Sequence, residues 1–293
     1  MSKKIYIINL IFLSFMLQCL ISANSLTKKT EAKNKVTVKT WKTAQPPNAK
    51  IQQLKKVEYK GVSFEYNPQI FGKVTSEEVA EFPLENEDNK PDNVAPRHIF
   101  FKLSKPNQNR EIKIAIYPVE DFKKMFAVSK SETRRVENEF NNLRKVLKNE
   151  KFRVENQIPY VPFIDAEQSF QTKVKRFSIQ NGKGIFFLTQ YNIEPSLINN
   201  EGLTYIFQGL TDDGKKYILA EFPVSIAFLP KDFETREFEG YKLADNLENK
   251  SDLKRYKDYV RKTEKSLGKL TQNQFEPNLK YYEEIISSIK IEK

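Results

Sequence analysis

The sequence predicts an α+β fold with a largely antiparallel sheet, packed helices, a C-terminal helical pair and a disordered N-terminal linker. Stretches of alternating apolar and polar residues are typical of strands, and most neighbouring stretches are separated by hairpin-length turns. Elsewhere the apolar spacing changes to the period of a helix. Aromatic residues make up 12% of the 293 residues, which is enough to build a sizeable core.

The first expected strand is 57–66, where alternation suits a sheet with one solvated face. The acidic, proline-containing segment 72–96 is predicted to be a surface loop. Three hairpins are expected around 106–109, Asn181-Gly182 and Asp212-Asp213-Gly214. Their strands are 97–103 with 111–117, 168–179 with 184–193, and 203–210 with 217–227.

Helices are predicted between and after these hairpins. Ser129 and Glu132 have the spacing of a capping box, and a helix of about five turns is expected to follow. A short helix is expected at 119–126, and 157–165 is predicted to be extended. Two more helices are expected at 250–270 and 277–289. The outer face of the first of these is basic, with Lys254, Lys257, Arg261, Lys265 and Lys269.

The first 23 residues have the pattern of a secretory signal peptide. Lys3 and Lys4 form a positive start, an apolar run follows over 5–21, and 22–25 are small and polar. The run is shorter than the roughly 20 residues that a membrane-spanning helix prefers, although an uncleaved anchor is the alternative. We therefore expect an exported protein that is periplasmic, secreted or a membrane-anchored lipoprotein.

Cys19 is the only cysteine, so no intramolecular disulfide and no multi-cysteine metal site can form. It lies at the end of the apolar run, where the acylated cysteine of a bacterial lipoprotein would be. The preceding 15–18 resemble a lipobox, but Gln18 departs from the usual small residue. A cut after Ala23 would instead remove Cys19. Lipidation at Cys19 would tether the protein to a membrane, and both alternatives stay open here.

The charge of +11 is concentrated near the N-terminus. Residues 24–60 hold ten lysines and two glutamates, whereas 61–245 are close to neutral. We expect a basic flexible linker at 24–56, an α+β domain at 57–232 and a C-terminal helical extension at 233–293. Such a block of like charges is typical of a solvated, extended linker, and the alternative is a tail that lies along an anionic membrane surface. A folded nucleic-acid interface is not expected.

The residues that could carry chemistry are few, and the sequence assigns no catalytic, cofactor-binding or metal-ligating residue. His98 is the only histidine, which argues for a structural role because histidine metal sites need several ligands. Asp165 and Glu167 could form a pair of catalytic carboxylates. Two other motifs are interpreted as turns, because the features of a calcium loop and of a phosphate loop are missing from them. These are Asp212-Asp213-Gly214 and Gly182-x-Gly184.

The segment 203–217 (LTYIFQGLTDDGKKY) is distinctive. Together with Gly184-Ile185, 188–191 (LTQY) and 61–68 (GVSFEYNP), it resembles a group of uncharacterised exported bacterial proteins. The resemblance covers about 57–230 and implies export and a shared fold, without an assigned activity. The Gly-x-Ser-Phe-x-Tyr opening also looks like PsbP and Mog1-type domains, which are noncatalytic sandwiches of sheet and helices.

The sequence therefore favours an exported, noncatalytic protein that binds an unknown protein or small ligand or associates with the cell envelope. No cofactor and no nucleic-acid partner are expected. The alternative is a secreted hydrolase that uses carboxylates, and a purely structural envelope protein is a third hypothesis.

Overall fold

The computed structural model describes residues 54–104, 110–148, 158–245 and 247–292. Every described residue belongs to one compact unit, Ile51–Lys293. The signal-peptide region, Cys19 and the basic linker as far as residue 53 lie outside the described residues.

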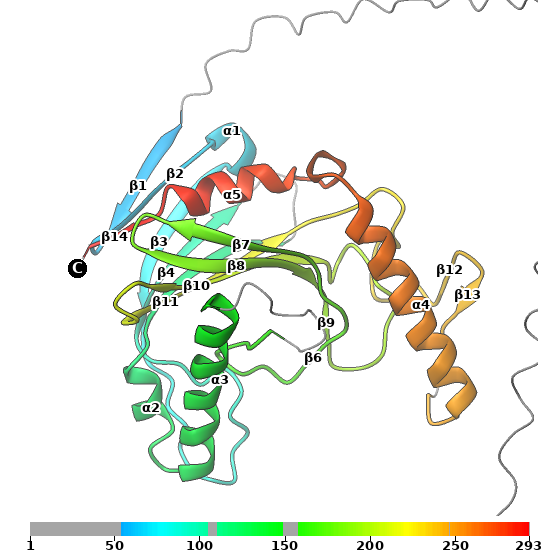
Figure 1. Ribbon diagram of the computed structural model, residues 1–293, viewed down its shortest axis with the longest axis horizontal. Coiled ribbons are helices and arrows are strands. Elements are labelled where there is room, and N and C mark those ends of the chain that lie inside the picture. Colours follow the sequence, from blue (N-terminus) through cyan, green and yellow to red (C-terminus); the bar gives the residue numbers. More distant parts are fainter. Residues whose placement is uncertain (1–53, 105–109, 149–157, 246, 293) are drawn as a thin grey trace, which may run out of the picture. The chain divides into compact units, whose positions relative to one another are not determined.

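A seven-stranded sheet forms the centre of this unit (Figure 1). Its order is β3-β4-β5-β11-β10-β8-β7, and every neighbouring pair is antiparallel. The antiparallel sheet expected from the sequence is therefore confirmed. The strands are β3 (Lys73–Val79), β4 (His98–Ser104), β5 (Ile112–Pro118), β7 (Thr172–Ile179), β8 (Gly182–Thr189), β10 (Thr204–Thr211) and β11 (Lys216–Pro223).

Three smaller sheets accompany the main one. A three-stranded sheet has the order β1-β2-β14, and two further pairs are β6–β9 and β12–β13. The bounds are β1 (Lys55–Tyr59), β2 (Val62–Tyr66), β6 (Glu167–Gln168), β9 (Tyr191–Asn192), β12 (Glu237–Phe238), β13 (Tyr241–Lys242) and β14 (Lys290–Ile291).

The helices fall largely where the apolar spacing predicted them. They are α1 (Pro68–Phe71), α2 (Asp121–Met125), α3 (Lys130–Lys148), α4 (Lys250–Lys269), the 3₁₀ helix η1 (Gln272–Gln274) and α5 (Leu279–Ser287). The Glu132 backbone N–H donates to Ser129 Oγ at 3.4 Å, so Ser129 caps α3. The Ser129 N–H donates to the Phe126 carbonyl oxygen at 2.9 Å and not to Glu132, so the second half of the expected capping box is not formed. Within the described residues, no helix is both long enough and apolar enough to cross a membrane.

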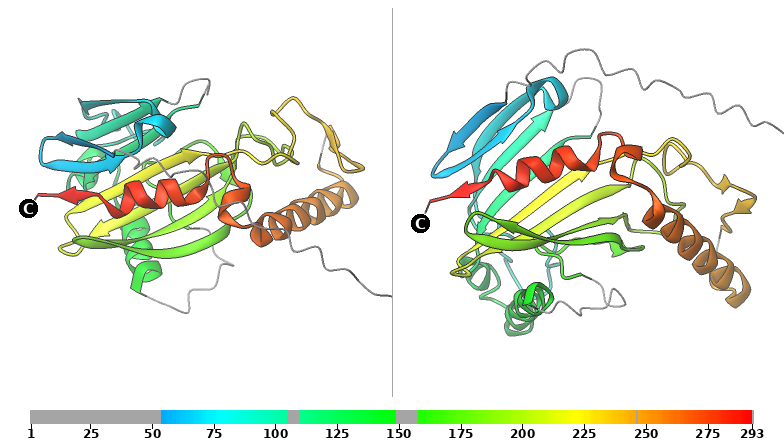
Figure 2. Two further views of the ribbon diagram at one scale, coloured as in Figure 1. Left: turned by 90° about the horizontal axis from the view of Figure 1, so that it is seen from above. Right: turned by 45° about the horizontal axis from the view of Figure 1, so that its top comes forward.

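Both faces of the main sheet are covered, as the two views of Figure 2 show. Along β8, Phe186 and Leu188 lie in one hydrophobic cluster while Ile185 and Phe187 lie in the other. The first cluster is closed by α5, and the second by α2 and α3. Because alternate side chains of a strand point to opposite faces, the helices on each face pack against a different set of side chains from the same strands.

The C-terminal part of the chain shares the core of the sheet. Tyr282, Ile285 and Ile286 of α5 are buried in the cluster that holds Phe186 and Leu188. β14 then adds to the edge of β2 through Lys290 and Ser63. The segment 233–293 is thus helical where expected, and its last elements are packed into the first hydrophobic cluster.

Two segment predictions are corrected by the structure. The single strand expected at 57–66 is the hairpin β1–β2, because Lys60 and Gly61 both adopt positive φ angles (46° and 75°) and reverse the chain. The loop expected at 72–96 begins with β3, an edge strand whose side chains are mostly exposed. An edge strand with charged, solvated side chains shows little apolar alternation, so the pattern gave no strand signal.

The hairpin between β7 and β8 is shifted from the expected position. Ile179 pairs with Gly182, so the turn residues are Gln180 and Asn181, and β7 begins only at Thr172. A Cβ at Gly182 would lie 2.4 Å from the Leu210 carbonyl oxygen. The glycine is therefore required by the close approach of β10, and not by a left-handed turn.

Candidate functional site

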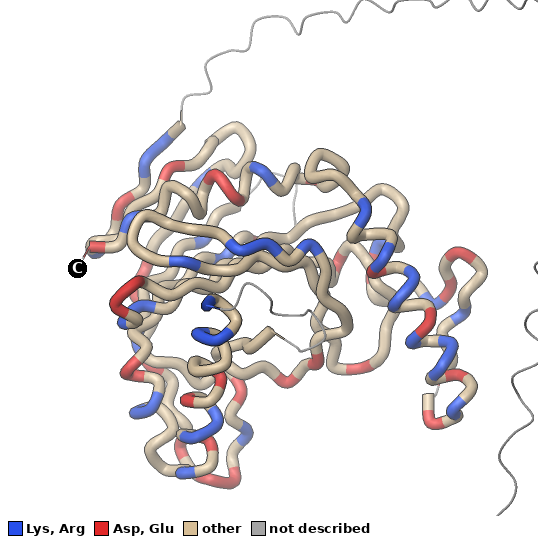
Figure 3. Tube along the Cα trace, viewed as in Figure 1, with Lys and Arg blue, Asp and Glu red and all other residues tan. Residues whose placement is uncertain are grey.

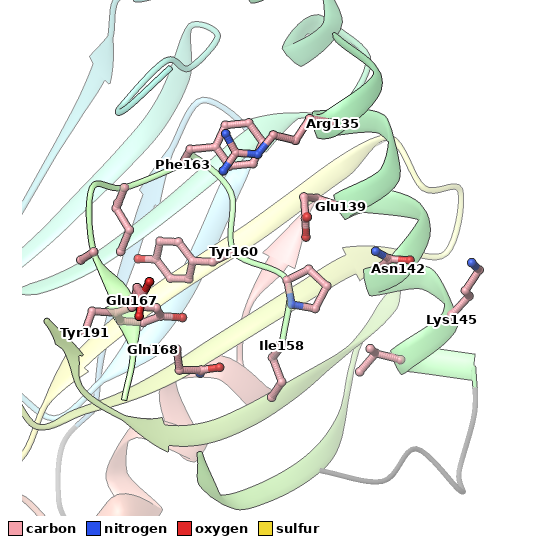
Figure 4. A pocket seen from close by; sticks show the side chains of 14 residues that line it. Arg135, Glu139, Asn142, Lys145, Ile158, Tyr160, Phe163, Glu167, Gln168 and Tyr191 are labelled. Carbon is pink, nitrogen blue, oxygen red and sulfur yellow. The ribbon is translucent and has the colours of Figure 1, made fainter. Parts of the chain in front are cut away.

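A pocket of about 750 Å³ lies between α3 and the segment 158–168, which runs across the α3 side of the sheet (Figure 4). We call it the α3 pocket. Its walls combine polar side chains of both signs with aromatic rings. The polar and aromatic residues that line it are Arg135, Glu139, Asn142, Lys145, Tyr160, Phe163, Glu167, Gln168 and Tyr191.

The α3 wall of the pocket is polar because of helical spacing. Arg135, Glu139 and Asn142 are four and three residues apart, so they share the edge of α3 next to its buried stripe. The Arg135 guanidinium lies 4.0 Å from the centre of the Phe163 ring, which fixes its position. Burial raises the pKa of Glu139, and the charge of Arg135 opposes that shift.

The opposite wall is built around two tyrosines. Tyr160 donates a hydrogen bond from its hydroxyl to Glu221 Oε1 on β11. The rings of Tyr160 and Tyr191 lie with their centres 4.9 Å apart. Burial raises the pKa of both phenols far above the ordinary value, so both are neutral hydrogen-bonding groups at physiological pH.

Three buried polar atoms beside this wall have no hydrogen-bond partner among the described residues. They are Nε2 and Oε1 of Gln168 and the hydroxyl oxygen of Tyr191. Buried side-chain polar atoms are paired in the large majority of cases, and an unpaired one costs about 1–3 kcal/mol. Figure 4 shows Gln168 and Tyr191 on the wall that faces Glu139 and Asn142. The terminal torsion of glutamine is soft, so a small rotation turns the amide toward a bound molecule.

Sequence-predicted His98 lies outside the α3 pocket. Its ring stacks on Tyr117, with 4.3 Å between the centres, and Nδ1 lies 2.8 Å from the Pro96 carbonyl oxygen. Burial lowers the pKa of this imidazole. Among the described residues, no group of three His, Cys, Asp or Glu side chains is arranged to hold a metal ion. These contacts agree with a structural role for His98.

The carboxylate pair predicted at 165 and 167 is separated in the structure. Asp165 forms an exposed ion pair with Lys90, with 2.6 Å between Oδ2 and Nζ, and does not line the pocket. Glu167 does line it. The second carboxylate of the pocket is Glu139, which the sequence had not singled out. The helical spacing of Arg135, Glu139 and Asn142 was a signal that could have located it.

The two turn motifs are packing features. Gly214 has a φ of 71° and closes the β10–β11 turn, where Thr211 Oγ1 donates to Asp213 Oδ1 at 2.6 Å. A Cβ at Gly184 would lie 2.3 Å from the Phe207 ring and 2.5 Å from the Gln208 carbonyl oxygen. The turn predicted at Asp212-Asp213-Gly214 is therefore confirmed, whereas Gly182 and Gly184 lie in β8, so the interpretation of Gly182-x-Gly184 as a turn was wrong.

Comparison of the chain with protein-family models and with curated proteins finds no match.

Proposed function

We propose that this chain is an exported, noncatalytic binding protein whose α3 pocket holds a small polyhydroxylated ligand of the saccharide class. The observation that carries the proposal is the set of unpaired buried polar atoms on Gln168 and Tyr191. A ligand that donates to and accepts from these atoms would remove a cost that the free protein carries.

The composition of the walls supports an uncharged ligand. Arg135, Lys145, Glu139 and Glu167 all line the pocket, so its Arg, Lys and Glu side chains carry no net charge when all are ionised. Hydroxyl groups both donate and accept, and therefore match an amide, a phenol and carboxylates at once. The rings of Tyr160 and Tyr191 supply apolar surface for the C–H faces of a sugar.

Export is part of the proposal and rests on residues 1–23. The signal-peptide pattern supports it, as does the resemblance to exported bacterial proteins. Processing at Cys19 would give a lipoprotein held at a membrane, and processing after Ala23 would release the chain to the periplasm or medium. The intact mass of the mature protein distinguishes these alternatives, because a lipidated chain begins at Cys19 and carries acyl groups.

The binding proposal is tested by calorimetric titration with a panel of mono- and disaccharides, together with zwitterionic and anionic molecules of similar size. We expect a neutral saccharide to bind, and Gln168→Leu to weaken that binding by at least about tenfold through the loss of two hydrogen bonds. Asp165→Ala is the matched control, because Asp165 lies on the same segment but outside the pocket. Unchanged affinity in Gln168→Leu contradicts the proposal.

A second candidate is a glycoside hydrolase, favoured by the two carboxylates of the pocket. The raised pKa of Glu139 is a property of a general acid, and Glu167 would act as its ionised partner. Glu139→Gln and Glu167→Gln separate the two functions. A hydrolase loses turnover of a glycoside in both variants but keeps its affinity for sugar, whereas a binding protein shows no turnover in any form.

A further inference from the structure

The outer face of α4 carries a row of cations that the α3 pocket does not use. This helix holds eight Lys or Arg residues and three Asp or Glu residues, a net charge of +5. Its inner face is set by Tyr259, Thr263 and Leu267, which are buried. All eight cations are exposed. Figure 3 shows blue segments recurring along the helix, separated by tan and red ones.

Six of these cations form one stripe along the solvent side of the helix, with spacings of four, three, four, four and four residues. At a rise of 1.5 Å per residue, the row is about 28 Å long. The row consists of Lys250, Lys254, Lys257, Arg261, Lys265 and Lys269. We call it the α4 cation row.

The charges of the row are mostly not neutralised by the protein. Arg261 pairs with Asp258 at 2.9 Å, but no described residue forms an ion pair with any of the five lysines of the row. The other ion pairs of α4 involve Arg255 and Lys262, which lie on its flanks. The lysines of the row therefore repel one another on the solvent-exposed side of the helix.

The helix is held firmly from its inner side. Tyr256 donates to the Ser196 carbonyl oxygen at 3.1 Å, and the Ile198 N–H donates to the Tyr259 hydroxyl at 3.1 Å. At the C-terminal end, Lys173 Nζ donates to the Gly268 carbonyl oxygen at 2.8 Å, where a cation complements the helix dipole. These contacts hold α4 in one orientation, while its N-terminal part extends beyond the main sheet and lies beside β12 and β13 (Figure 1).

We infer that the α4 cation row docks this protein on an anionic lipid surface. The inference is supported by charge complementarity. The α4 cation row is about 28 Å long, its five lysines form no ion pair with a described residue, and an extended anionic surface would supply the missing negative charge. A small anion would need convergent donors in a cavity, and the row is spread along a convex helix. Single-stranded nucleic acid is bound with stacking aromatic residues, and the row contains none. This inference is independent of the α3 pocket.

The test measures co-sedimentation of the chain that begins at Asn24, without the apolar run 5–21 and Cys19, with vesicles of phosphatidylcholine that contain about 30% phosphatidylglycerol, at about 0.1 M salt. We compare the natural chain with the triple variant Lys254→Gln/Lys257→Gln/Lys265→Gln. Each lysine near an anionic surface contributes about fivefold to the partition coefficient, so the triple variant should bind about 100-fold more weakly. Binding of the natural chain should disappear at about 1 M salt.

The matched control is Lys55→Gln/Lys73→Gln/Lys183→Gln, which removes the same charge from exposed positions outside α4. It should bind within about threefold of the natural chain, since screening confines the attraction to nearby charges. Equal losses in both triple variants, or no loss in the α4 variant, overturn the inference. The inference is also overturned if the α4 triple variant binds single-stranded DNA more weakly than the natural chain does but binds vesicles equally well. Any contribution of the lysines at 24–53 is common to all three proteins.

Discussion

Two sets of buried polar groups, one on each face of the main sheet, differ in their hydrogen bonding. On the α5 side, the Glu283 carboxylate accepts from Lys175 Nζ at 2.7 Å, from Gln272 Nε2 at 2.8 Å and from the Tyr205 hydroxyl at 3.1 Å. On the α3 side, the polar atoms of Gln168 and Tyr191 have no partner among the described residues.

The difference separates a structural role from a binding role. A fully bonded buried carboxylate holds α5, η1, β7 and β10 in one arrangement, and nothing further can bind to it without breaking those bonds. An unpaired amide beside a pocket costs stability until another molecule pairs with it. The proposed site therefore rests on buried polar atoms that lack partners beside a cavity, and not on buried polarity alone.

The largest effect is expected for Glu283→Ala, which tests the hydrogen-bonded polar groups around Glu283. Removal of the carboxylate leaves Lys175, Tyr205 and Gln272 without their acceptor, and we expect the free energy of unfolding to fall by about 2–4 kcal/mol. Urea denaturation measures it. Glu284→Ala is the control, because Glu284 is exposed and pairs only with Lys280 at 3.6 Å, and it should change stability by less than about 0.5 kcal/mol. Equal effects of the two changes would contradict the assigned role of Glu283.

A matched pair of Tyr→Phe changes compares the two faces directly. Tyr205→Phe removes a buried hydrogen bond to Glu283 and should lower the free energy of unfolding by about 1 kcal/mol. Tyr191→Phe removes a hydroxyl that has no partner, so the free energy of unfolding should be unchanged or higher. Thermal unfolding followed by circular dichroism measures both. A larger loss in Tyr191→Phe would mean that its hydroxyl is bonded in the free protein.

Gln168→Leu should raise stability while it removes binding. The change replaces two unpaired polar atoms by apolar ones of similar size, and we expect a gain of up to about 1 kcal/mol in the free energy of unfolding. Calorimetric unfolding without ligand measures the gain. A destabilised Gln168→Leu variant would show that the amide supports the fold, and the proposed site would then lose its main support.

The smallest expected effect concerns Glu139. Burial raises its pKa, so the folded state binds the proton more tightly than the unfolded state does. Stability from this group is therefore lost as the pH rises through the unfolded pKa and then the folded pKa. Glu139→Gln removes that loss, and its melting temperature relative to the natural protein should rise from pH 4 to pH 7. A difference that does not change with pH would contradict the burial of this carboxyl group.

The strands that carry strong turn residues could be predicted from the sequence. Asp212-Asp213-Gly214 placed the two strand ends that flank the turn, at Thr211 and Lys216, within one residue, but β11 ends at Pro223, four residues before the end of the strand expected at 217–227. The apolar stripe of Val136, Phe140 and Leu143 likewise located α3, because helical spacing is a local property. Where a short stretch of chain determines the structure, the sequence was sufficient.

The wall of the α3 pocket that holds Gln168 and Tyr191 could not be predicted in the same way. Gln168 and Tyr191 pair with each other, although 23 positions of sequence separate them. Each lies in a strand of only two residues, which is too short to show a periodic pattern. Whether their polar atoms have partners depends on the segment 158–168 and on α3 together. The same is true of Lys60-Gly61, whose reversal is seen only in the pairing of β1 with β2.

The closing strand β14 also sets the order in which the protein can be completed. Ser288 Oγ accepts from the Glu65 backbone N–H across 223 residues, and the Glu292 N–H donates to the Gly61 carbonyl oxygen. A ribosome therefore makes the β1–β2 hairpin more than 220 residues before its partner strand. The hairpin edge stays unpaired while those residues are made, and the core beneath α5 closes only after synthesis has passed residue 291.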